Sequence, residues 1–375
     1  MPVSPDKEVS NLHQSADTGK LPVLTAFQIK IYPFVCAYFP SVIFLFEITR
    51  VLRNSHAKFL LSRNIIQLTA SLETHRLRKE YGAYTALDDL SFSIPKGAVF
   101  GLLGPNGAGK TSLIRIITQI TAPDSGQVLF GGEPLGPQHI SRIGYLPEER
   151  GLYKKSKVGE QLLYFAQLKG MSKNEALERA KDWFIRLDIK DWWNKNVEDL
   201  SKGMAQKLQF IVSVIHEPEF IILDEPFSGF DPVNSDIIRD EILRLHAGGA
   251  TIMFSTHRME TVEELCSHIM LLNKSRKVLE GPVKEVRNSF KTNLFTAVTQ
   301  SRLEFESLPW EPVAECMNTE CETGWKSSFY IPEGRRSNEL VQDIIQLAEL
   351  VSFREELPTF HEIFKQVVNL KTSAA

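Results

Sequence analysis

The stretch that decides the fold runs from Ala98 to Ile117 and reads AVFGLLGPNGAGKTSLIRII. Its apolar first part, Val99 to Leu103, predicts a short buried strand, and the spacing after Lys110 predicts a helix. Between them the sequence matches the GxxxxGK[ST] pattern of a phosphate-binding loop, in the strand–loop–helix context that this pattern requires. The glycines permit backbone conformations closed to residues with a Cβ, so consecutive N–H groups can point into one concave nest. The stretch therefore predicts a site for the phosphates of a nucleotide.

The positions of this loop have expected roles in holding a nucleoside triphosphate. The N-terminus of the following helix favours an anion, because its first N–H groups are unpaired and the helix dipole is positive there. Lys110 places a positive charge on the β- and γ-phosphates, and the Thr111 hydroxyl is positioned to bind Mg²⁺. The loop residues expected to contact the nucleotide are Gly104, Pro105, Asn106, Gly107, Ala108, Gly109, Lys110, Thr111 and Ser112.

The composition is that of an ordinary soluble globular protein, long enough for two domains. The chain has 375 residues, of which 43% are hydrophobic and 24% are charged, and its formal net charge is −3. This charge gives no sign of a surface that binds polyanions, so we expect no nucleic-acid partner. The four cysteines are few and scattered and lack the spacing of zinc ligands, which favours reduced thiols in a reducing compartment.

Residues 1–71 are expected to form an N-terminal extension. Residues 1–20 are polar, and we expect them to be disordered. The uncharged run from Ile31 to Phe46 falls short of the about 20 apolar residues that a membrane-spanning helix needs, and it contains two prolines. Three interpretations of this run stay open: a weak membrane anchor, a segment that packs on a membrane partner, or an upstream extension that is not part of the working protein.

From Leu72 onward, strand patterns and helical patterns alternate around the phosphate loop. Strands are expected on both sides of it and again at FIILDEP and TIMFST, whereas residues from about 150 to 216 have helical spacing. This alternation predicts a mainly parallel α/β sheet with a helical insertion, within a domain spanning 72–290. Residues 291–375 are expected to form a small α+β accessory domain, with helices over Asn338–Leu350 and Thr359–Leu370.

Two adjacent acids follow an apolar strand and complement the phosphate loop. The strand FIILD ends at Asp224, which a buried strand would hold rigidly where it can support the Mg²⁺ shell. Glu225 begins the next loop, and a carboxylate there can accept the proton of a water aimed at the γ-phosphate. Alone, such a pair is typical of a solvated loop. Beside a phosphate loop it predicts a magnesium ligand and a general base.

The order of these motifs resembles the ATP-binding-cassette (ABC) ATPases, from about Leu72 to Ser289. The sequence LSKGM, Leu200 to Met204, is similar to the family's signature, usually written LSGGQ. The resemblance implies a P-loop cassette with a mainly parallel core, an antiparallel β subdomain and a helical insertion. It also implies that Ser201 and Gly203 bind the γ-phosphate of ATP held by a second subunit, which agrees with the anion preference of a helix N-terminus.

Further residues match the family's other motifs. The run SGFD, Ser228 to Asp231, resembles the D-loop, which crosses the dimer interface. His257 follows TIMFST at the position of the switch histidine, where the resemblance implies contact with the γ-phosphate and the attacking water. Tyr81 is similar to the aromatic residue that stacks on adenine. Tyr84 is the competing candidate, and a core role stays open for either ring.

Two motifs depart from the family pattern. Glu148 replaces the Q-loop glutamine; its carboxylate still offers an oxygen to Mg²⁺ and to water, but it adds negative charge near the γ-phosphate. Lys202 and Met204 replace a glycine and the glutamine of the signature. The runs EERGLY and LSKG together resemble the sodium-exporter (Nat-type) branch and related multidrug and antibiotic exporters, whose ATPases also carry a C-terminal extension of similar length.

The resemblance implies a function as well as a fold. It implies an ATPase that binds ATP and Mg²⁺ and drives a separate integral membrane permease, as part of an exporter. Such a subunit is cytoplasmic, lies on the inner face of the cell membrane through the permease, and works as a homodimer or with a second cassette. The expected catalytic residues are Glu225, His257, Lys110 and Glu148. The expected metal ligands are Thr111, Asp224 and Glu148, and Tyr81, Ser201 and Gly203 are expected to bind the nucleotide together with the loop.

Two other classes of function stay open. One is an ABC ATPase that remodels a macromolecular complex and moves no solute. The chain has a single cassette and no long coiled-coil insertion, which weighs against this class. The other is a nucleotide-sensing module that hydrolyses nothing, against which Glu225 and His257 weigh.

Overall fold

The structure is a computed structural model that describes residues 70–149 and 151–372. The expected N-terminal extension up to residue 69, with its apolar run, lies outside the described residues. Within the two described ranges, no helix is long and apolar enough to cross a membrane.

A six-stranded sheet lies at the centre of the fold, in the order β10-β9-β3-β8-β7-β6. Its strands are β3 (Val99–Leu103), β6 (Ile143–Leu146), β7 (Phe220–Asp224), β8 (Thr251–Thr256), β9 (His268–Asn273) and β10 (Arg276–Pro282). All neighbours from β9 to β6 pair in parallel, and only β10 is antiparallel to its neighbour. Strands β3, β7 and β8 are buried along their whole length, which explains their continuous apolar sequences. The mainly parallel α/β core is confirmed.

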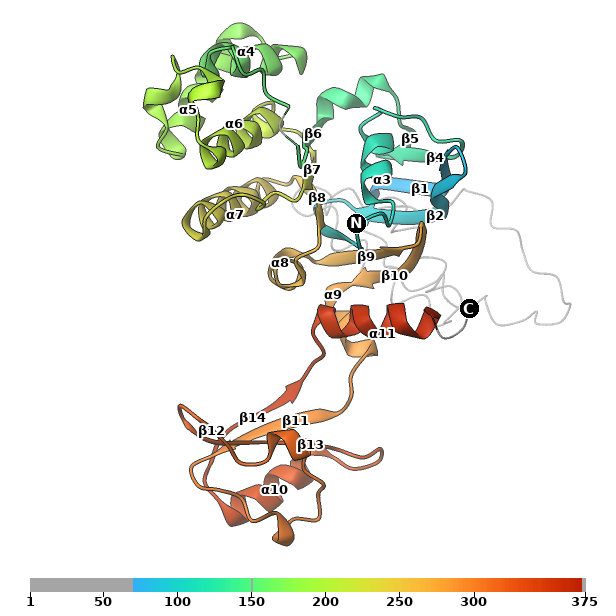
Figure 1. The fold of residues 1–375 in the computed structure, drawn as a ribbon, viewed down its shortest axis with the longest axis vertical. Coiled ribbons are helices and arrows are strands. Elements are labelled where there is room, and N and C mark those ends of the chain that lie inside the picture. The colour runs from blue at the N-terminus through green and yellow to red at the C-terminus, as the bar shows by residue number, and fades with distance from the viewer. Residues whose placement is uncertain (1–69, 150, 373–375) are drawn as a thin grey trace, which may run out of the picture. The chain divides into compact units, whose positions relative to one another are not determined.

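A second sheet is entirely antiparallel, and the helix that follows the phosphate loop packs against it. It has the order β2-β1-β4-β5, with β1 (Ala70–Tyr81), β2 (Tyr84–Pro95), β4 (Ser125–Phe130) and β5 (Glu133–Pro134). Helix α3 (Lys110–Ile117) packs Leu113 and Ile114 into a core shared with Leu72 and Leu90 of this sheet and with the central sheet. Figure 1 shows α3 beside the antiparallel strands. The N-terminus of α3 is thereby fixed between two sheets.

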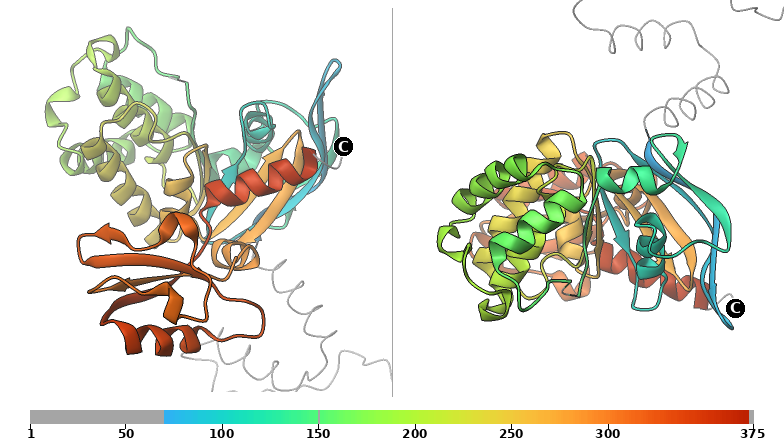
Figure 2. Two further views of the ribbon diagram at one scale, coloured as in Figure 1. Left: turned by 60° about the horizontal axis from the view of Figure 1, so that its bottom comes forward. Right: turned by 90° about the horizontal axis from the view of Figure 1, so that it is seen from above.

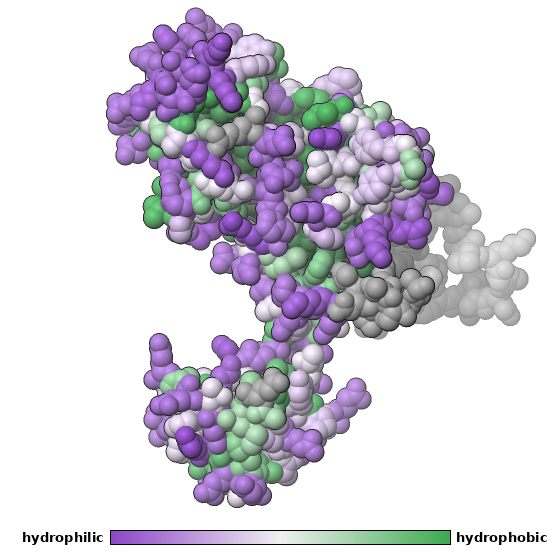
Figure 3. Space-filling view, viewed as in Figure 1, coloured by the Kyte–Doolittle hydropathy of each residue, from purple (hydrophilic) through white to green (hydrophobic). Residues whose placement is uncertain are grey.

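Helices cover the other part of the central sheet. Three occupy the stretch where the insertion was predicted: α4 (Val158–Leu168), α5 (Lys173–Arg186) and α6 (Lys202–Val214). Both views of Figure 2 place these helices on the side of the sheet away from the antiparallel strands. On the face shown in Figure 3, hydrophilic side chains predominate over the insertion, and hydrophobic ones show in small groups.

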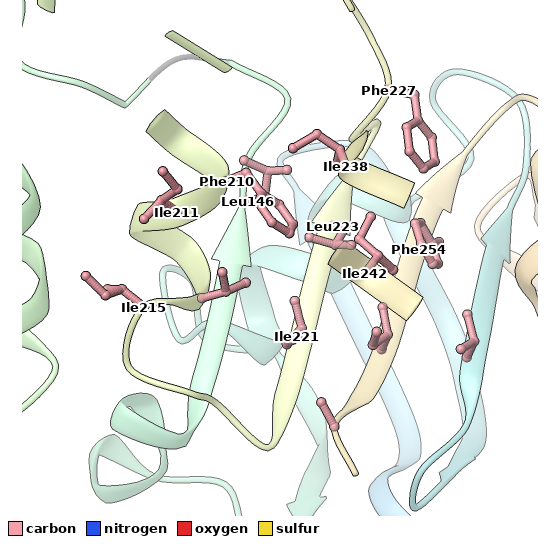
Figure 4. Packing of buried hydrophobic residues seen from close by; sticks show 14 of the residues in the cluster. Leu146, Phe210, Ile211, Ile215, Ile221, Leu223, Phe227, Ile238, Ile242 and Phe254 are labelled. Carbon is pink, nitrogen blue, oxygen red and sulfur yellow. The ribbon is translucent and has the colours of Figure 1, made fainter. Parts of the chain in front are cut away.

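The side chains of α6 meet the central sheet in one continuous core. Phe210 of α6 is fully buried, and Ile238 and Ile242 of α7 (Pro232–Ala247) are buried beside it against Leu223 and Phe254. Figure 4 shows these groups pointing toward one another from the two helices and from β7 and β8. The helix that begins at the signature stretch is therefore packed on the strand that carries Asp224.

The C-terminal region forms its own four-stranded antiparallel sheet, in the order β12-β13-β11-β14. Its elements are β11 (Leu294–Thr299), β12 (Thr319–Cys321), β13 (Gly324–Tyr330), α10 (Ser337–Leu347) and β14 (Leu350–Glu356). The helix predicted over Asn338–Leu350 ends earlier, at Leu347, because Ala348 is extended (φ −152°, ψ 156°) and Leu350 already pairs in β14. That prediction was wrong at its end: pairing with β11 outweighs the helical spacing there.

The C-terminal helix packs against the helices beside the central sheet. The remaining helices are α8 (Met259–Leu265), α9 (Val283–Ser289) and α11 (Phe360–Thr372). The Phe360 N–H donates to Glu263 of α8 at 2.8 Å, and the Arg287 guanidinium donates to the Pro358 carbonyl at 3.1 Å. Phe360 and Ile363 are buried in the same core as the insertion helices.

Candidate active site

The phosphate loop joins β3 to α3 and takes its shape from two glycines. Gly104 has φ +152°, and a Cβ there would lie 2.4 Å from the Leu272 carbonyl oxygen. Gly109 has φ +110°, and a Cβ there would lie 2.3 Å from the Ala86 carbonyl oxygen. Because neither neighbour is a flexible side-chain end, any larger residue would displace the backbone. These two positions of the GxxxxGK pattern are therefore required by the fold of the loop itself.

The N-terminus of α3 is open to an anion. Gly109 is its N-cap and supplies no side-chain hydrogen bond, whereas Ser172, Ser201 and Asp231 cap α5, α6 and α7 with their side chains. The first N–H groups of α3 thus lack the side-chain acceptor that these other helices have. A phosphate is the group that such a helix end binds.

Lys110 lies in this nest with the predicted acids around it. Its Nζ donates to the carbonyl oxygens of Gly104, at 2.7 Å, and Pro105, at 3.2 Å. Burial lowers the pKa of Lys110, and the nearby negative charges of Glu225, Asp224 and Glu148 oppose that shift. The structure therefore brings the lysine and all three predicted carboxylates to one site.

The surroundings of Asp224 fit a divalent cation. Burial raises the pKa of Asp224, and the negative charges of Glu148 and Glu225 act in the same direction, whereas the Ser255 hydroxyl, from its partner residue across β7 and β8, lowers it. A hydrated Mg²⁺ would relieve the repulsion among these carboxylates. Thr111 lies one residue into α3, beside Lys110, where a phosphate-bound cation would reach it.

No cluster of three or more His, Cys, Asp and Glu side chains that could hold a metal occurs in residues 70–149 and 151–372. Mg²⁺ is usually held by one or two carboxylates together with substrate phosphates, so a magnesium site does not require such a cluster. The residues present therefore fit a magnesium ion that arrives with the nucleotide.

Glu225 and His257 form a hydrogen-bonded pair at the carboxyl end of the central sheet. The Oε1 atom of Glu225 accepts the His257 backbone N–H at 2.9 Å and lies 2.6 Å from His257 Nδ1. Its Oε2 atom accepts the Thr256 hydroxyl at 3.2 Å. Glu225 is 9% exposed, whereas the His257 side chain is 67% exposed. The Glu225 carboxylate is therefore fixed in direction, whereas the His257 imidazole is exposed and can contact a ligand.

The backbone at Glu225 is also unusual. Its φ is +49°, in the left-handed region that a residue with a Cβ rarely adopts. Such a conformation is unfavourable by about 1 kcal/mol or more and persists where its surroundings enforce it. Here the Glu225 N–H donates to the Ser255 carbonyl at 2.8 Å, in addition to the side-chain bonds. The strain turns the carboxylate back toward β8 and His257.

The two candidate adenine-binding tyrosines are neighbours. Tyr81 and Tyr84 pair directly across the β1–β2 hairpin, so their side chains leave the sheet on the same face. The Tyr84 hydroxyl donates to the Gly107 carbonyl of the phosphate loop at 2.6 Å. The residues are 43% and 52% exposed, so neither has the core role that the sequence left open. Tyr84 contacts the phosphate loop, and the centroid of the Tyr81 ring lies 5.4 Å from Lys79 Nζ.

The signature residues lie at the start of α6 and against the D-loop. The Ser201 hydroxyl accepts the Met204 N–H at 3.3 Å, and Ser201 is exposed. A Cβ on Gly229 would lie 2.4 Å from Lys202 Cε, so the D-loop packs on the first turn of α6. Among the described residues, no hydrogen bond or ion pair joins Ser201 or Gly203 to the phosphate loop of the same chain. Their expected phosphate would come from a second subunit.

Sequence reasoning missed one residue near the site. Gln209 of α6 is 5% exposed and donates hydrogen bonds to the Pro147 and Glu149 carbonyls, on either side of Glu148. The available signal was a glutamine inside the apolar run LQFIVSVI.

A cleft of about 780 Å³ on the antiparallel sheet shares no residue with this site. Its arginines are already paired: Arg78 and Arg276 with Asp88, and Arg76 with Asp89. We assign it no role in nucleotide binding.

Two family models match the chain. Residues 87–228 match the model described as ABC transporter, and residues 281–368 match that of the C-terminal domain of DrrA1-3-like ATP-binding proteins. The first range contains the phosphate loop, Glu148, the signature stretch and the two acids Asp224 and Glu225. His257 lies beyond it.

Curated relatives and solved structures agree with these matches. The chain is 39% identical over 306 residues to an uncharacterized ABC transporter ATP-binding protein, YhaQ, of Bacillus subtilis (strain 168), covering 79% of this chain and 98% of the relative. It is 36% identical over 227 residues to Nod factor export ATP-binding protein I of Cupriavidus metallidurans, covering 59% and 74%. A solved structure titled "Structure of ATP binding subunit of ABC transporter" is similar with a TM-score of 0.56 and 30% identity, covering 58% of this chain and 92% of that one. The predicted cassette fold is confirmed.

Proposed function

Because this chain belongs to the ATP-binding proteins of ABC transporters, we propose that it hydrolyses MgATP and thereby drives a separate membrane permease of an exporter. The observation that carries the proposal is the Glu225 carboxylate, buried and fixed by His257 beside Lys110 and Asp224. This carboxylate favours hydrolysis over nucleotide sensing alone.

The reaction is the attack of water on the γ-phosphate, which gives ADP and phosphate. Lys110 and the uncapped N–H groups of α3 hold the β- and γ-phosphates and stabilise the charge of the transition state. Glu225 accepts the proton of the attacking water, and His257 holds Glu225 in direction through Nδ1. The positive charge of Mg²⁺, when bound, neutralises the phosphates. The residues that would hold it are Thr111, Asp224 and Glu148.

The proposal includes a second cassette, either another copy of this chain or a different protein. Ser201 is exposed at a helix N-terminus with Gly203 in the same turn, which suits a phosphate presented by the facing subunit. ATP then lies between one phosphate loop and the opposite signature, and hydrolysis loosens the interface. We assign this work to a cassette over 72–290, with residues 291–375 as an accessory domain and 1–71 as an extension.

The relatives support a direction of transport, and the location is part of the proposal. The similar protein named for Nod factor export supports export. We place the chain in the cytoplasm, on the inner face of the cell membrane through its permease, without a nucleic-acid partner. The relatives reported above are transporter proteins, which favours this function over the remodelling of a macromolecular complex.

One experiment tests the whole proposal. The full chain is purified from membranes in mild detergent, its companions are identified, and MgATP turnover of the purified material is measured. An integral membrane protein in comparable amount, together with turnover, would support the proposal. Ribosomal or DNA-bound companions without a membrane protein, or no turnover, would contradict it.

We expect Tyr81 and Tyr84 to contribute differently to ATP affinity. Tyr81→Ala removes an aromatic face from the adenine and should weaken ATP binding about tenfold, whereas Tyr81→Phe should not. Tyr84→Phe keeps its ring but loses the bond to Gly107, so affinity should fall only about threefold. Titration with a fluorescent ATP analogue measures both. If Tyr84→Ala weakens binding and Tyr81→Ala does not, the adenine lies on Tyr84 instead.

A further inference from the structure

Gln209 is a buried polar side chain that the proposed reaction does not use. It lies in α6 between Leu208 and Phe210, both fully buried, and is itself 5% exposed. An apolar residue would suit such a position, because a buried amide is unfavourable unless its hydrogen bonds are made. The glutamine therefore needs an explanation beyond packing.

Its hydrogen bonds supply that explanation. The Nε2 atom of Gln209 donates to the Pro147 carbonyl at 3.1 Å and to the Glu149 carbonyl at 3.0 Å. An amide nitrogen carries two hydrogens, so both are used. The two acceptors are the residues immediately before and after Glu148. One side chain of α6 thus holds the backbone on both sides of Glu148.

Glu148 itself faces the reaction site from outside the core. Its side chain is exposed, yet its negative charge acts on Lys110 and on Asp224. No hydrogen bond or ion pair of its own carboxylate is found among the described residues. The point from which the Glu148 side chain extends is set by the backbone on either side of it, which Gln209 holds.

We propose that Gln209 is a positioning residue that aims Glu148 at the magnesium ion of the bound nucleotide. This inference rests on the proposed function, in which Glu148 is a metal ligand.

Gln161 offers a matched control for substitutions of Gln209. Gln161 of α4 is 2% exposed, and its Nε2 donates to the Tyr153 carbonyl at 3.0 Å and to the Ser156 hydroxyl at 2.7 Å. It is the same kind of buried amide, and it holds the loop after Glu148 rather than the residues beside it. Gln161→Met should disturb packing about as much as Gln209→Met without redirecting Glu148.

The experiment measures ATP affinity of the full chain by calorimetry, with Mg²⁺ and with a chelator in its place. In Gln209→Met, the gain in affinity that Mg²⁺ provides should shrink about tenfold, the size expected for loss of a group that orients a metal ligand. In a Glu148→Ala background the same substitution should change this gain less than twofold. Gln161→Met should leave it as in the parent. Gln209→Asn, whose shorter amide withdraws from both carbonyls, provides a second variant with the same expected pattern.

A second readout needs no nucleotide. A protease that cleaves after glutamate should cut the free chain at Glu148 and Glu149 faster in Gln209→Met than in the parent or in Gln161→Met. The inference is overturned if Gln209→Met retains the full effect of Mg²⁺, if it loses as much without Glu148, or if cleavage is unchanged. A parent protein that binds no ATP would instead overturn the proposed function.

Discussion

Glu225→Gln is expected to lower the rate of MgATP hydrolysis about 10²- to 10³-fold while ATP affinity stays within about twofold of the parent. Glutamine keeps the size of the side chain and an oxygen that can accept the His257 N–H, which the Glu225 Oε1 atom accepts at 2.9 Å. It cannot take a proton from water. Phosphate release under saturating MgATP measures the rate, and equilibrium binding measures the affinity.

The same variant should accumulate ATP-bound dimers, because the two subunits separate only after hydrolysis in the proposed cycle. Size-exclusion chromatography with MgATP detects them. Glu219→Gln is the matched control: Glu219 immediately precedes β7, whereas Glu225 immediately follows it, and it pairs with Arg142 at the surface. Turnover of Glu225→Gln near the parental rate, or an equal loss in Glu219→Gln, would refute the base assignment.

The parts of the site that the sequence predicted are those built from short contiguous patterns. The phosphate loop is such a pattern, and so is the apolar strand ending at Asp224, because parallel strands buried on both faces read as apolar runs. The carboxyl ends of neighbouring parallel strands lie at one edge of the sheet. Glu225 and His257, which follow β7 and β8, therefore meet although 32 residues separate them.

The parts that the sequence did not predict depend on contacts between distant residues. Gln209 donates a hydrogen bond to the Pro147 carbonyl, 62 positions away in the sequence. The helical spacing of α6 does not indicate which carbonyls accept hydrogen bonds from this amide. Strand β14 depends on its pairing with β11, a distant segment of the chain. The local sequence pattern does not contain this contact, and the prediction from that pattern therefore continued the preceding helix to Leu350. The bond from Tyr84 to Gly107 likewise depends on how the hairpin lies over the loop.

Lys110→Ala is expected to weaken ATP binding by about 10²-fold or more. The lysine brings its charge into a partly buried nest, where truncating one member of a charged pair leaves the phosphates without their counter-charge. The substitution also removes the hydrogen bonds from Nζ to Gly104 and Pro105, which tie the two ends of the loop together before ATP arrives. Equilibrium titration with ATP in the presence of Mg²⁺ measures the loss.

The pH dependence of binding separates the charge of Lys110 from its role in shaping the loop. Because burial lowers the pKa of Lys110, raising the pH should discharge it earlier than an exposed lysine, and ATP affinity should fall as it does so. In Lys110→Ala this decline should be absent, since the titrating group is gone. Lys96→Ala, at an exposed lysine just before β3, should bind ATP and respond to pH as the parent does. If Lys110→Ala binds ATP as tightly as the parent, the nucleotide does not occupy this loop, and the roles assigned to Glu225 and His257 fail with it.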